Sequence, residues 1–356
     1  MTASSLIGAF KDWSAEGRPL VLATVFETAG STYSKCGAQM LITDDGRFQG
    51  MLSGGCLEGD LAERARTVLR SGNAQTVVYD LGKNDDELWG LGVGCDGLMK
   101  IFLQPLRPET AYEPFAAMAG VFSGDRMQLA ATVIKSSIAH LRVGATQVTA
   151  DEDAGFSDLP VSVTEEIGLL GDEFLATGDS GCRRISDTSG AAKILFTVLK
   201  PPPALLVLGA GLDAEPLVRF AHELGWKVTL QDHRPAYLDA GNFSGAETLH
   251  CVPVDELSDV INFDQFAAVI IMSHHLVSDR QYLRQIADSD IAYVGLLGPV
   301  DRRRRLLEEL GAQAEKLEAR LHGPAGIDIG GRGPASIALS IVAEIHLNIF
   351  RPETGA

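Results

Sequence analysis

The second half of the chain alternates short, continuous apolar runs with segments whose apolar residues recur at helical spacing. Three runs have the length of strands, at residues 205–208, 266–272 and 291–294, and a further strand is predicted at 226–230, where Lys227 and Thr229 interrupt the apolar residues. Runs of this kind are typical of strands buried on both faces of a parallel sheet. The helices predicted between and after them include one with a stripe formed by Leu217, Val218, Ala221 and Leu224. This alternation predicts an α/β domain with a doubly wound parallel sheet.

The first half of the chain predicts a more mixed arrangement. A helix over residues 5–16 precedes strands at 20–28, 38–43, 47–52, 75–79 and 98–103, with a helix at 61–70. The pattern then predicts a helix at 114–122, strands at 129–135 and 139–148, and short strands and turns as far as residue 199. Three consecutive prolines at 201–203 form a stiff connector. We therefore predict an N-terminal mixed α/β domain at 1–108, a middle β-rich or connecting region at 109–200, and the doubly wound domain at 201–356.

Composition and charge narrow the class of protein. The formal net charge of −17 argues against nonspecific binding to nucleic acid or anionic membranes. No stretch approaches the roughly 18 apolar residues of a membrane-spanning helix, and the N-terminus lacks the basic start and apolar core of a signal peptide. Five cysteines occur without a C-x-x-C pair. These features predict a cytoplasmic protein with free thiols.

The strongest motif lies at the first turn of the C-terminal domain. Gly209, Gly211 and Ala214 give the spacing G-x-G-x-x-A between a predicted strand and a helix. The first glycine permits a tight turn, and the second lets backbone N–H groups approach a pyrophosphate at the positive end of the helix. Asp232 ends the next strand about 20 residues later, where an acid can accept hydrogen bonds from a ribose. The motif predicts a Rossmann-like fold but leaves the ligand open: a dinucleotide, another phosphate-bearing molecule, or none.

Other candidate binding residues follow predicted strands of this domain. Ligands of open α/β sheets bind beyond the carboxyl ends of the strands. His274 follows the run at 266–272, so it is a candidate ligand residue, with a capped loop histidine as the alternative. Gly298 follows the run at 291–294, and Asp328 lies in a glycine-rich loop. We expect both to contribute to cofactor binding.

Arginines supply the basic groups that an anionic ligand needs in an acidic protein. Arg234 comes two residues after Asp232, in a loop that can present its guanidinium to a phosphate. Residues 302–305 are four consecutive arginines. Such a cluster is usually a solvated helix face. Its position after a strand end offers the alternative that one of these arginines reaches the ligand.

Glycine-flanked cysteines mark the N-terminal domain. Cys56 lies in the sequence S-G-G-C-L-E just before the predicted helix at 61–70, where the helix dipole favours a thiolate. A thiolate there could bind a soft metal, accept sulfur or act as a nucleophile; the alternative is a small buried cysteine at a tight turn. Glu58 is either a first-turn helix acid or a general base. Cys95 lies in a second glycine-rich stretch, so the two thiols could line one pocket. Cys182 is predicted to lie in a surface loop.

Several motifs in order resemble the XdhC/CoxI family of xanthine dehydrogenase accessory, or maturation, factors. The N-terminal match comprises Gly30-Ser31-Thr32, Gly37-Ala38-Gln39-Met40, Asp45-Gly46, Ser53-Gly54-Gly55-Cys56-Leu57-Glu58 and Gly94-Cys95-Asp96-Gly97. The C-terminal match comprises residues 201–203, Leu208-Gly209-Ala210-Gly211, Asp232-His233-Arg234-Pro235, Ser273-His274, Gly295-Leu296-Leu297-Gly298, residues 323–328 and residues 340–344. Residues 109–200 carry little of the resemblance.

The resemblance implies a chaperone for the molybdenum cofactor (molybdopterin). Such a factor binds the cofactor, assists its sulfuration together with a cysteine desulfurase, and delivers it to a xanthine dehydrogenase-type molybdoenzyme. By position, Cys56 and Cys95 become candidates for holding the metal or sulfur end of the cofactor. The turn at Gly209 and Gly211 would hold the pterin phosphate or a nucleotide. The chain departs from the family at Leu212, where many relatives have histidine, and at Asp96, where glycine is common.

Two other functions remain open at this point. The Gly209 motif with Asp232 also fits an NAD(P)-dependent oxidoreductase, with Asp232 favouring NAD because it would repel a 2′-phosphate. The third hypothesis is a scaffold that docks a desulfurase to its client without touching the cofactor. We expect an accessory protein rather than a stand-alone enzyme, with its site in a crevice between the two main domains. A homodimer is expected on general frequency alone.

Overall fold

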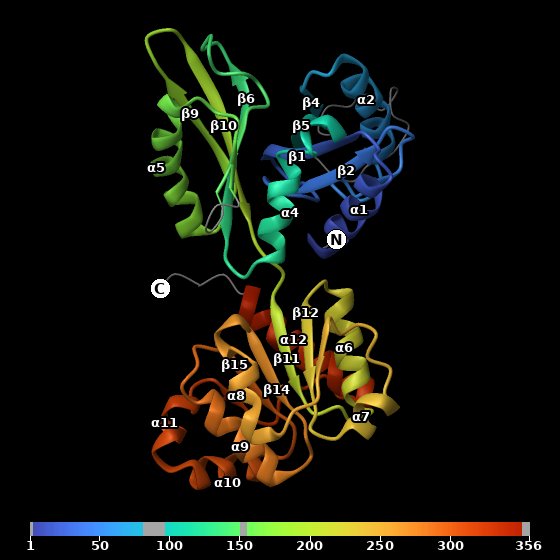
Figure 1. Ribbon diagram of the computed structural model, residues 1–356, viewed down its shortest axis with the longest axis vertical. Coiled ribbons are helices and arrows are strands. Elements are labelled where there is room, and N and C mark those ends of the chain that lie inside the picture. Colours follow the sequence, from blue (N-terminus) through green and yellow to red (C-terminus); the bar gives the residue numbers. More distant parts are fainter. Residues whose placement is uncertain (1–2, 81–96, 150–154, 351–356) are drawn as a thin grey trace. The chain divides into compact units, whose positions relative to one another are not determined.

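The computed structural model describes residues 3–80, 97–149 and 155–350. The chain packs as two compact units, Met1–Pro201 and Pro202–Ala356 (Figure 1). Within the described ranges, no helix is both long and apolar enough to span a lipid bilayer. Cys95 lies outside these ranges.

The first sheet of unit 1 is antiparallel, with the strand order β3-β2-β1-β5-β4. Its elements are α1 (Ala3–Ala15), β1 (Leu20–Ala29), β2 (Gln39–Thr43), β3 (Phe48–Gln49), α2 (Glu58–Ser71), β4 (Gln75–Asp80) and β5 (Leu98–Leu106). Helix α2 packs its buried residues Leu61, Ala65 and Val68 on one face of this sheet. Because α2 begins at Glu58, the glycine-rich stretch with Cys56 forms the connection from β3 into that helix.

A second antiparallel sheet completes unit 1, with the order β8-β7-β6-β10-β9. Its elements are η1 (Pro108–Thr110), α4 (Phe115–Ser123), β6 (Gln128–Ser136), β7 (Thr146–Val148), β8 (Phe156–Ser157), α5 (Val161–Thr177), β9 (Gly181–Ser186) and β10 (Ala191–Leu199). Helix α5 packs on β6 and β10 through Val163, Ile167 and Phe174.

This region corrects three sequence predictions. Residues 161–177 form a helix rather than short strands and turns; their buried residues recur every three to four positions, but β-branched residues open the segment and obscure the pattern. The predicted strand at 139–148 shortens to β7, because Gly144 turns the chain with a φ of 87°. Cys182 lies in β9 and is partly buried, rather than in a surface loop, and its thiol donates to Phe26 O at 3.3 Å.

Unit 2 is built on a six-stranded parallel sheet with the order β13-β12-β11-β14-β15-β16. Its strands are β11 (Ala204–Leu208), β12 (Lys227–Gln231), β13 (Thr248–His250), β14 (Ala268–Ile271), β15 (Tyr293–Leu296) and β16 (Leu321–His322). Its helices are α6 (Ala214–Glu223), α7 (Pro235–Ala240), η2 (Val254–Glu256), α8 (Leu257–Val260), η3 (Phe263–Gln265), α9 (Leu276–Ile286), α10 (Val300–Leu310), η4 (Gly311–Gln313), α11 (Ala314–Leu317) and α12 (Pro334–Phe350). Numbered within the unit, the strand order is 3-2-1-4-5-6, that of a doubly wound dinucleotide-binding fold.

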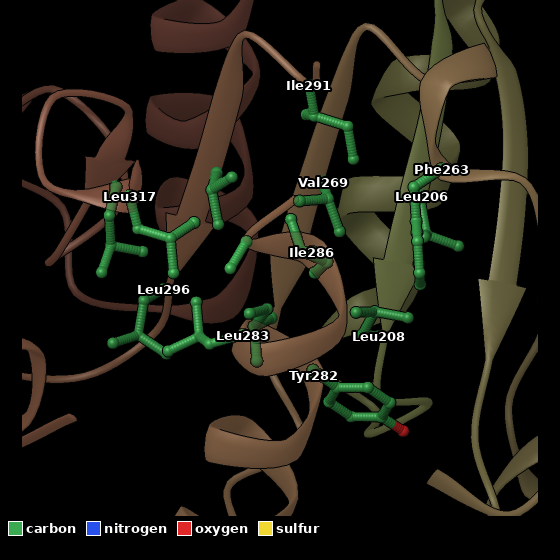
Figure 2. Close-up of a cluster of buried hydrophobic side chains, with 14 of the residues drawn as sticks. Leu206, Leu208, Phe263, Val269, Tyr282, Leu283, Ile286, Ile291, Leu296 and Leu317 are labelled. Atoms are coloured by element: carbon green, nitrogen blue, oxygen red, sulfur yellow. The ribbon is translucent and has the colours of Figure 1, made fainter. Parts of the chain in front are cut away.

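Both faces of this sheet are covered by helices, as the apolar runs predicted. Helices α6 and α12 pack on one face and α9 and α10 on the other (Figure 1). Figure 2 shows the second of these layers, in which Tyr282 from α9 lies near Leu208, the last residue of β11. With both faces packed, the edge where the strands end is left for a ligand.

Candidate functional site

The turn after β11 has the backbone that the glycine motif predicts. Gly209 has a φ of 123°, and a Cβ there would lie 2.5 Å from Met272 O. Its N–H donates to Gln231 O at 2.8 Å, which ties the turn to the end of β12. A Cβ at Gly211 would collide with the Asp213 carboxylate. Glycine is therefore required at Gly209, whereas a side chain at Gly211 would displace only the Asp213 carboxylate; the chain enters α6 immediately afterwards.

Asp232 and Arg234 form an ion pair beside this turn. Asp232 is buried, and its Oδ2 accepts hydrogen bonds from Ala210 N and Arg234 Nη2, both at 2.8 Å. Its Oδ1 accepts from Arg234 N and Nε, both at 2.9 Å. Burial alone would raise the pKa of Asp232, but the bonds from Arg234 and Ala210 outweigh it and lower the pKa. The Arg234 guanidinium also lies 3.6 Å from the centre of the Tyr237 ring, so its position is fixed on two sides.

His274 reaches the same turn from β14. It has a φ of 58°, unusual for a residue with a side chain, and its Nε2 lies 2.8 Å from Asp213 Oδ2. A Cβ at Gly211 would lie 3.8 Å from the His274 ring. Leu212, in the middle of the turn, is 67% exposed. The structure thus brings His274 to the glycine turn, and the Leu212 side chain in that turn is exposed.

The four arginines of α10 are each engaged, and one of them belongs to the carboxyl edge. Arg302 donates through Nε to the buried Asp279 at 2.9 Å, and its Nη2 also contacts that carboxylate. The other Asp279 oxygen accepts from Ser273 Oγ, in the loop after β14. Gly298 has a φ of 131°, and a Cβ there would lie 2.5 Å from Arg302 Cδ. Three arginines are held by other partners: Arg303 by Leu321 O and Glu318 O, Arg304 by Asp301, and Arg305 by Glu309.

Tyr282, on α9, is a buried phenol close enough to Asp232, Arg234 and Asp279 for their charges to act on it. Burial raises its pKa to about 12. The phenol therefore stays neutral, and Arg234 and Arg302 are each held by a buried carboxylate, Asp232 and Asp279. The structure brings Gly209, Gly211, Asp232, Arg234, His274 and Gly298 to this edge. Asp328 is exposed, and its Oδ1 accepts from Gly330 N in its own loop at 3.0 Å.

A further polar cluster at β15, β16 and α12 was missed by the sequence analysis. Glu344 accepts hydrogen bonds from Tyr293 Oη at 2.5 Å, Gly326 N at 2.6 Å and His322 Nδ1 at 3.0 Å. Tyr293 and the segment that contains His322 and Gly326 are both distant from Glu344 in the chain, and the sequence alone assigns Glu344 no role. A histidine ending a short strand was the one signal that could have indicated the cluster.

Glu58 organises the loop that carries Cys56. Its Oε1 accepts from Leu52 N and Ser53 N, both at 2.9 Å. Its Oε2 accepts from Ser53 Oγ at 2.5 Å, Gly55 N at 3.0 Å and Leu57 N at 3.2 Å. Glu58 is 2% exposed, so these donors satisfy an otherwise buried carboxylate. This places Glu58 as the residue that shapes the loop, while Cys56 remains partly exposed at the start of α2.

One further loop, at residues 30–37, packs against the Cys56 loop. Ser34 Oγ donates to Met51 O at 3.2 Å, and a Cβ at Gly54 would lie 3.4 Å from the Tyr33 ring. The same loop meets Gly97, where a Cβ would collide with Ser31 O. Gly97 is two residues after Cys95, so the described part of the second cysteine motif lies against the loop that also contacts the first.

The Glu58 network predicts a specific acid dependence. Burial would raise the pKa of Glu58, but the bonds from Ser53 and Leu52 outweigh it and lower the pKa from its ordinary value of 4.5. A carboxylate with a depressed folded-state pKa adds stability above about pH 4.5, and that stability is lost as the pH falls through the depressed value. We expect the melting temperature of the wild-type protein to fall more steeply below pH 4.5 than that of a Glu58→Gln variant. Calorimetry from pH 7 to pH 3 measures this, and parallel curves would contradict the expectation.

Two family models match the chain in the two units just described. The model of the XdhC and CoxI family matches residues 13–80, and the model of the XdhC Rossmann domain matches residues 205–345. This chain belongs to the XdhC and CoxI family. The first match includes the Cys56 loop and the second includes the whole carboxyl edge of the parallel sheet, so the family resemblance predicted from the motifs is confirmed.

Similar proteins cover nearly the full length of this family member. A Bacillus subtilis (strain 168) protein, named as a probable subunit of xanthine dehydrogenase, is 28% identical over 91% of this chain and 92% of its own. The Escherichia coli (strain K12) molybdenum cofactor insertion chaperone PaoD is 24% identical over 92% of this chain and 83% of its own. A Bacillus halodurans crystal structure described as a xanthine dehydrogenase superposes with a TM-score of 0.78 at 28% identity, over 100% of this chain and 98% of that one.

Proposed function

We propose that this protein binds the molybdenum cofactor and delivers it to a xanthine dehydrogenase-type molybdoenzyme. The names of its full-length relatives, a probable subunit of xanthine dehydrogenase and a molybdenum cofactor insertion chaperone, support a role in molybdoenzyme maturation. Membership of the XdhC and CoxI family supports the same role. In this proposal the cofactor is cargo that is taken up and released.

The observation that carries the proposal is the fixed arginine beside the glycine turn. Arg234 is oriented by a buried carboxylate and by the Tyr237 ring, while it keeps about one third of its side chain exposed. A preoriented guanidinium next to the N-terminus of α6 suits a phosphate, because little side-chain entropy is lost on binding. The preoriented guanidinium is especially important for binding an anion in a chain with a net charge of −17, where an anion needs local basic groups.

The metal–sulfur group of the cofactor needs a different chemistry, for which the Cys56 thiol is a candidate. Thiolates are suited to soft metal–sulfur centres. Glu58 accepts five hydrogen bonds from the loop, so Cys56 lies at the start of α2 in a loop of fixed conformation. We propose that Cys56, together with Cys95, contacts the metal or sulfur end. In the same proposal the protein assists sulfuration with a cysteine desulfurase as a partner, and acts as a homodimer.

The alternative function is binding of NAD(P) for hydride transfer. The strand order and the Gly209 turn favour it. The hydrogen bonding of Asp232 disfavours NAD(P) binding, because the ribose of NAD needs a carboxylate oxygen that is available to a ligand. Both Asp232 oxygens already accept two hydrogen bonds each from the protein, and the residue is 1% exposed.

Reconstitution of a molybdoenzyme tests the proposed function. An apo-xanthine dehydrogenase, the molybdenum cofactor, a cysteine desulfurase and cysteine are mixed with and without this protein. We expect this protein to raise the yield of active enzyme, and Cys56→Ala to lower that yield by about tenfold or more, because a metal–sulfur contact is lost. Cys251→Ala is the matched control, since Cys251 is an exposed thiol in unit 2. Equal yields with Cys56→Ala and wild type would favour the scaffold function over cofactor binding.

A further inference from the structure

The polar cluster at β15, β16 and α12 fixes an imidazole in one orientation. The His322 ring stacks on the Tyr293 ring, with ring centres 4.4 Å apart and planes 24° apart. Its Nδ1 lies 3.0 Å from Glu344 Oε1. The stack sets the plane of the ring, and the carboxylate sets its rotation within that plane. His322 therefore has little freedom to turn, although about 29% of its side chain is exposed.

The same contacts determine which ring nitrogen carries the hydrogen. A carboxylate that already receives Gly326 N–H and Tyr293 O–H acts as an acceptor, so the His322 Nδ1 must donate to it. Burial, followed by the neighbouring Glu344, raises the pKa of Tyr293, which keeps its hydroxyl protonated as a donor. In the neutral form of the ring, the lone pair is then on Nε2. Among the described residues, Nε2 has no hydrogen-bond partner.

His322 ends β16, so it lies towards the same edge of the sheet as the glycine turn, on the face that α12 covers; Tyr293, the first residue of β15, lies further from that edge. The Tyr293 ring extends along its strand, since a Cβ at Gly295 would lie 3.0 Å from Tyr293 Cε1 and 3.1 Å from Ala325 Cβ. His322 is the last residue of β16 and is level with Gly295 in the sheet. Arg234 follows β12, but its guanidinium shares Asp232 Oδ2 with Ala210 N and so lies beside the end of β11. Two strands, β14 and β15, separate β11 from β16. At about 4.8 Å between neighbouring strands, the ends of β11 and β16 are ~14 Å apart.

We propose that His322 Nε2 is a second binding point at this edge, which accepts a hydrogen bond from an N–H group of a heterocycle. A molecule with a phosphate at one end and an N–H-bearing ring at the other would then lie along the edge, with its phosphate at Arg234 and its ring at His322. Molybdopterin has this pair of ends. The inference rests on the proposed function and adds an orientation: the pterin ring is held by unit 2 at β16.

Glu344 is a positioning residue in this arrangement, because it acts on the ligand only through His322. Its bond to Gly326 also holds the loop after β16 against α12. Replacing Glu344 would therefore disturb the loop as well as the imidazole. His322 is the better residue to vary, because its substitution leaves the Glu344–Gly326 and Glu344–Tyr293 bonds in place.

Titration of metal-free molybdopterin and, separately, inorganic pyrophosphate into four proteins tests the proposal. The proteins are the wild type, His322→Ala, His322→Gln and the control His222→Ala, whose histidine is exposed at the far end of α6. We expect His322→Ala to weaken molybdopterin binding about five- to tenfold, the loss for one hydrogen bond. His322→Gln should recover part of it, because the glutamine amide oxygen can accept where Nε2 did. Pyrophosphate affinity should be equal in all four proteins.

Side-chain ¹⁵N spectra of the wild type provide a readout that does not depend on a variant. His322 should be the tautomer with hydrogen on Nδ1, and its Nε2 resonance should move when molybdopterin is added. An Nε2 resonance that stays in place, or wild-type affinity in His322→Ala, would overturn the inference alone. If the wild type bound pyrophosphate but no molybdopterin, both the inference and the proposed function would be overturned.

Discussion

Replacing Glu58 with glutamine should lower the free energy of unfolding of unit 1 by about 3–4 kcal/mol. The carboxylate accepts five hydrogen bonds while buried, and a glutamine amide turns one acceptor into a donor that faces N–H groups. The lost bonds involve Leu52, Ser53, Gly55 and Leu57 and therefore loosen the whole Cys56 loop. Thermal unfolding measures the overall loss, and amide hydrogen exchange at those residues measures where it occurs.

Glu63→Gln is the matched control for this substitution. Glu63 lies on the same helix, but its side chain is 66% exposed and paired with Arg66. An exposed pair of this kind contributes little to stability. If the two variants melted at the same temperature, or if the loop amides were as protected in Glu58→Gln as in the wild type, Glu58 would not be organising the loop.

Replacing Asp232 with asparagine should lower both the stability of unit 2 and its affinity for phosphate. The buried carboxylate holds Arg234 through three bonds and the glycine turn through Ala210 N. Leaving the guanidinium without its charge partner is expected to lower the free energy of unfolding of unit 2 by about 2–3 kcal/mol. This loss is small for a buried pair because Arg234 is partly exposed. Arg234 also loses its orientation, so phosphate affinity should fall about tenfold even where the protein remains folded.

Melting temperature and pyrophosphate titration measure these two effects separately. Asp239→Asn serves as the control, because Asp239 is exposed on α7, close in sequence to the ion pair. A variant that bound pyrophosphate as tightly as the wild type would show that Arg234 is not the group that holds the anion.

Much of the parallel sheet could be predicted from the sequence, because its central strands β11, β14 and β15 lie within continuous apolar runs. The turn at Gly209 could also be predicted, since its spacing carries steric requirements that few other arrangements share. The helix α5 could not, because its β-branched start weakens the helical signal and its packing partners lie in β6 and β10. Tertiary contacts with these strands therefore decide that this segment is a helix.

The candidate site could likewise be predicted only in part. The sequence placed Asp232, Arg234 and His274 after strands, and the parallel topology collects such positions at one edge. It could not show that both Asp232 oxygens are occupied by hydrogen bonds from Arg234 and Ala210, or that Glu58 accepts five hydrogen bonds, because both facts depend on loop conformation. The partners of Glu344 come from three elements, and only the completed fold brings Tyr293, His322 and Gly326 to it.

Equilibrium binding of the intact molybdenum cofactor tests the account most directly. The purified full-length protein is titrated with the cofactor and, in a parallel cell, with NAD, and the Arg234→Ala and Cys56→Ala variants are treated in the same way. The account predicts saturable binding of the cofactor, weakened by each substitution, and no saturable binding of NAD. Saturable binding of NAD without binding of the cofactor would contradict it and would establish the dinucleotide function instead.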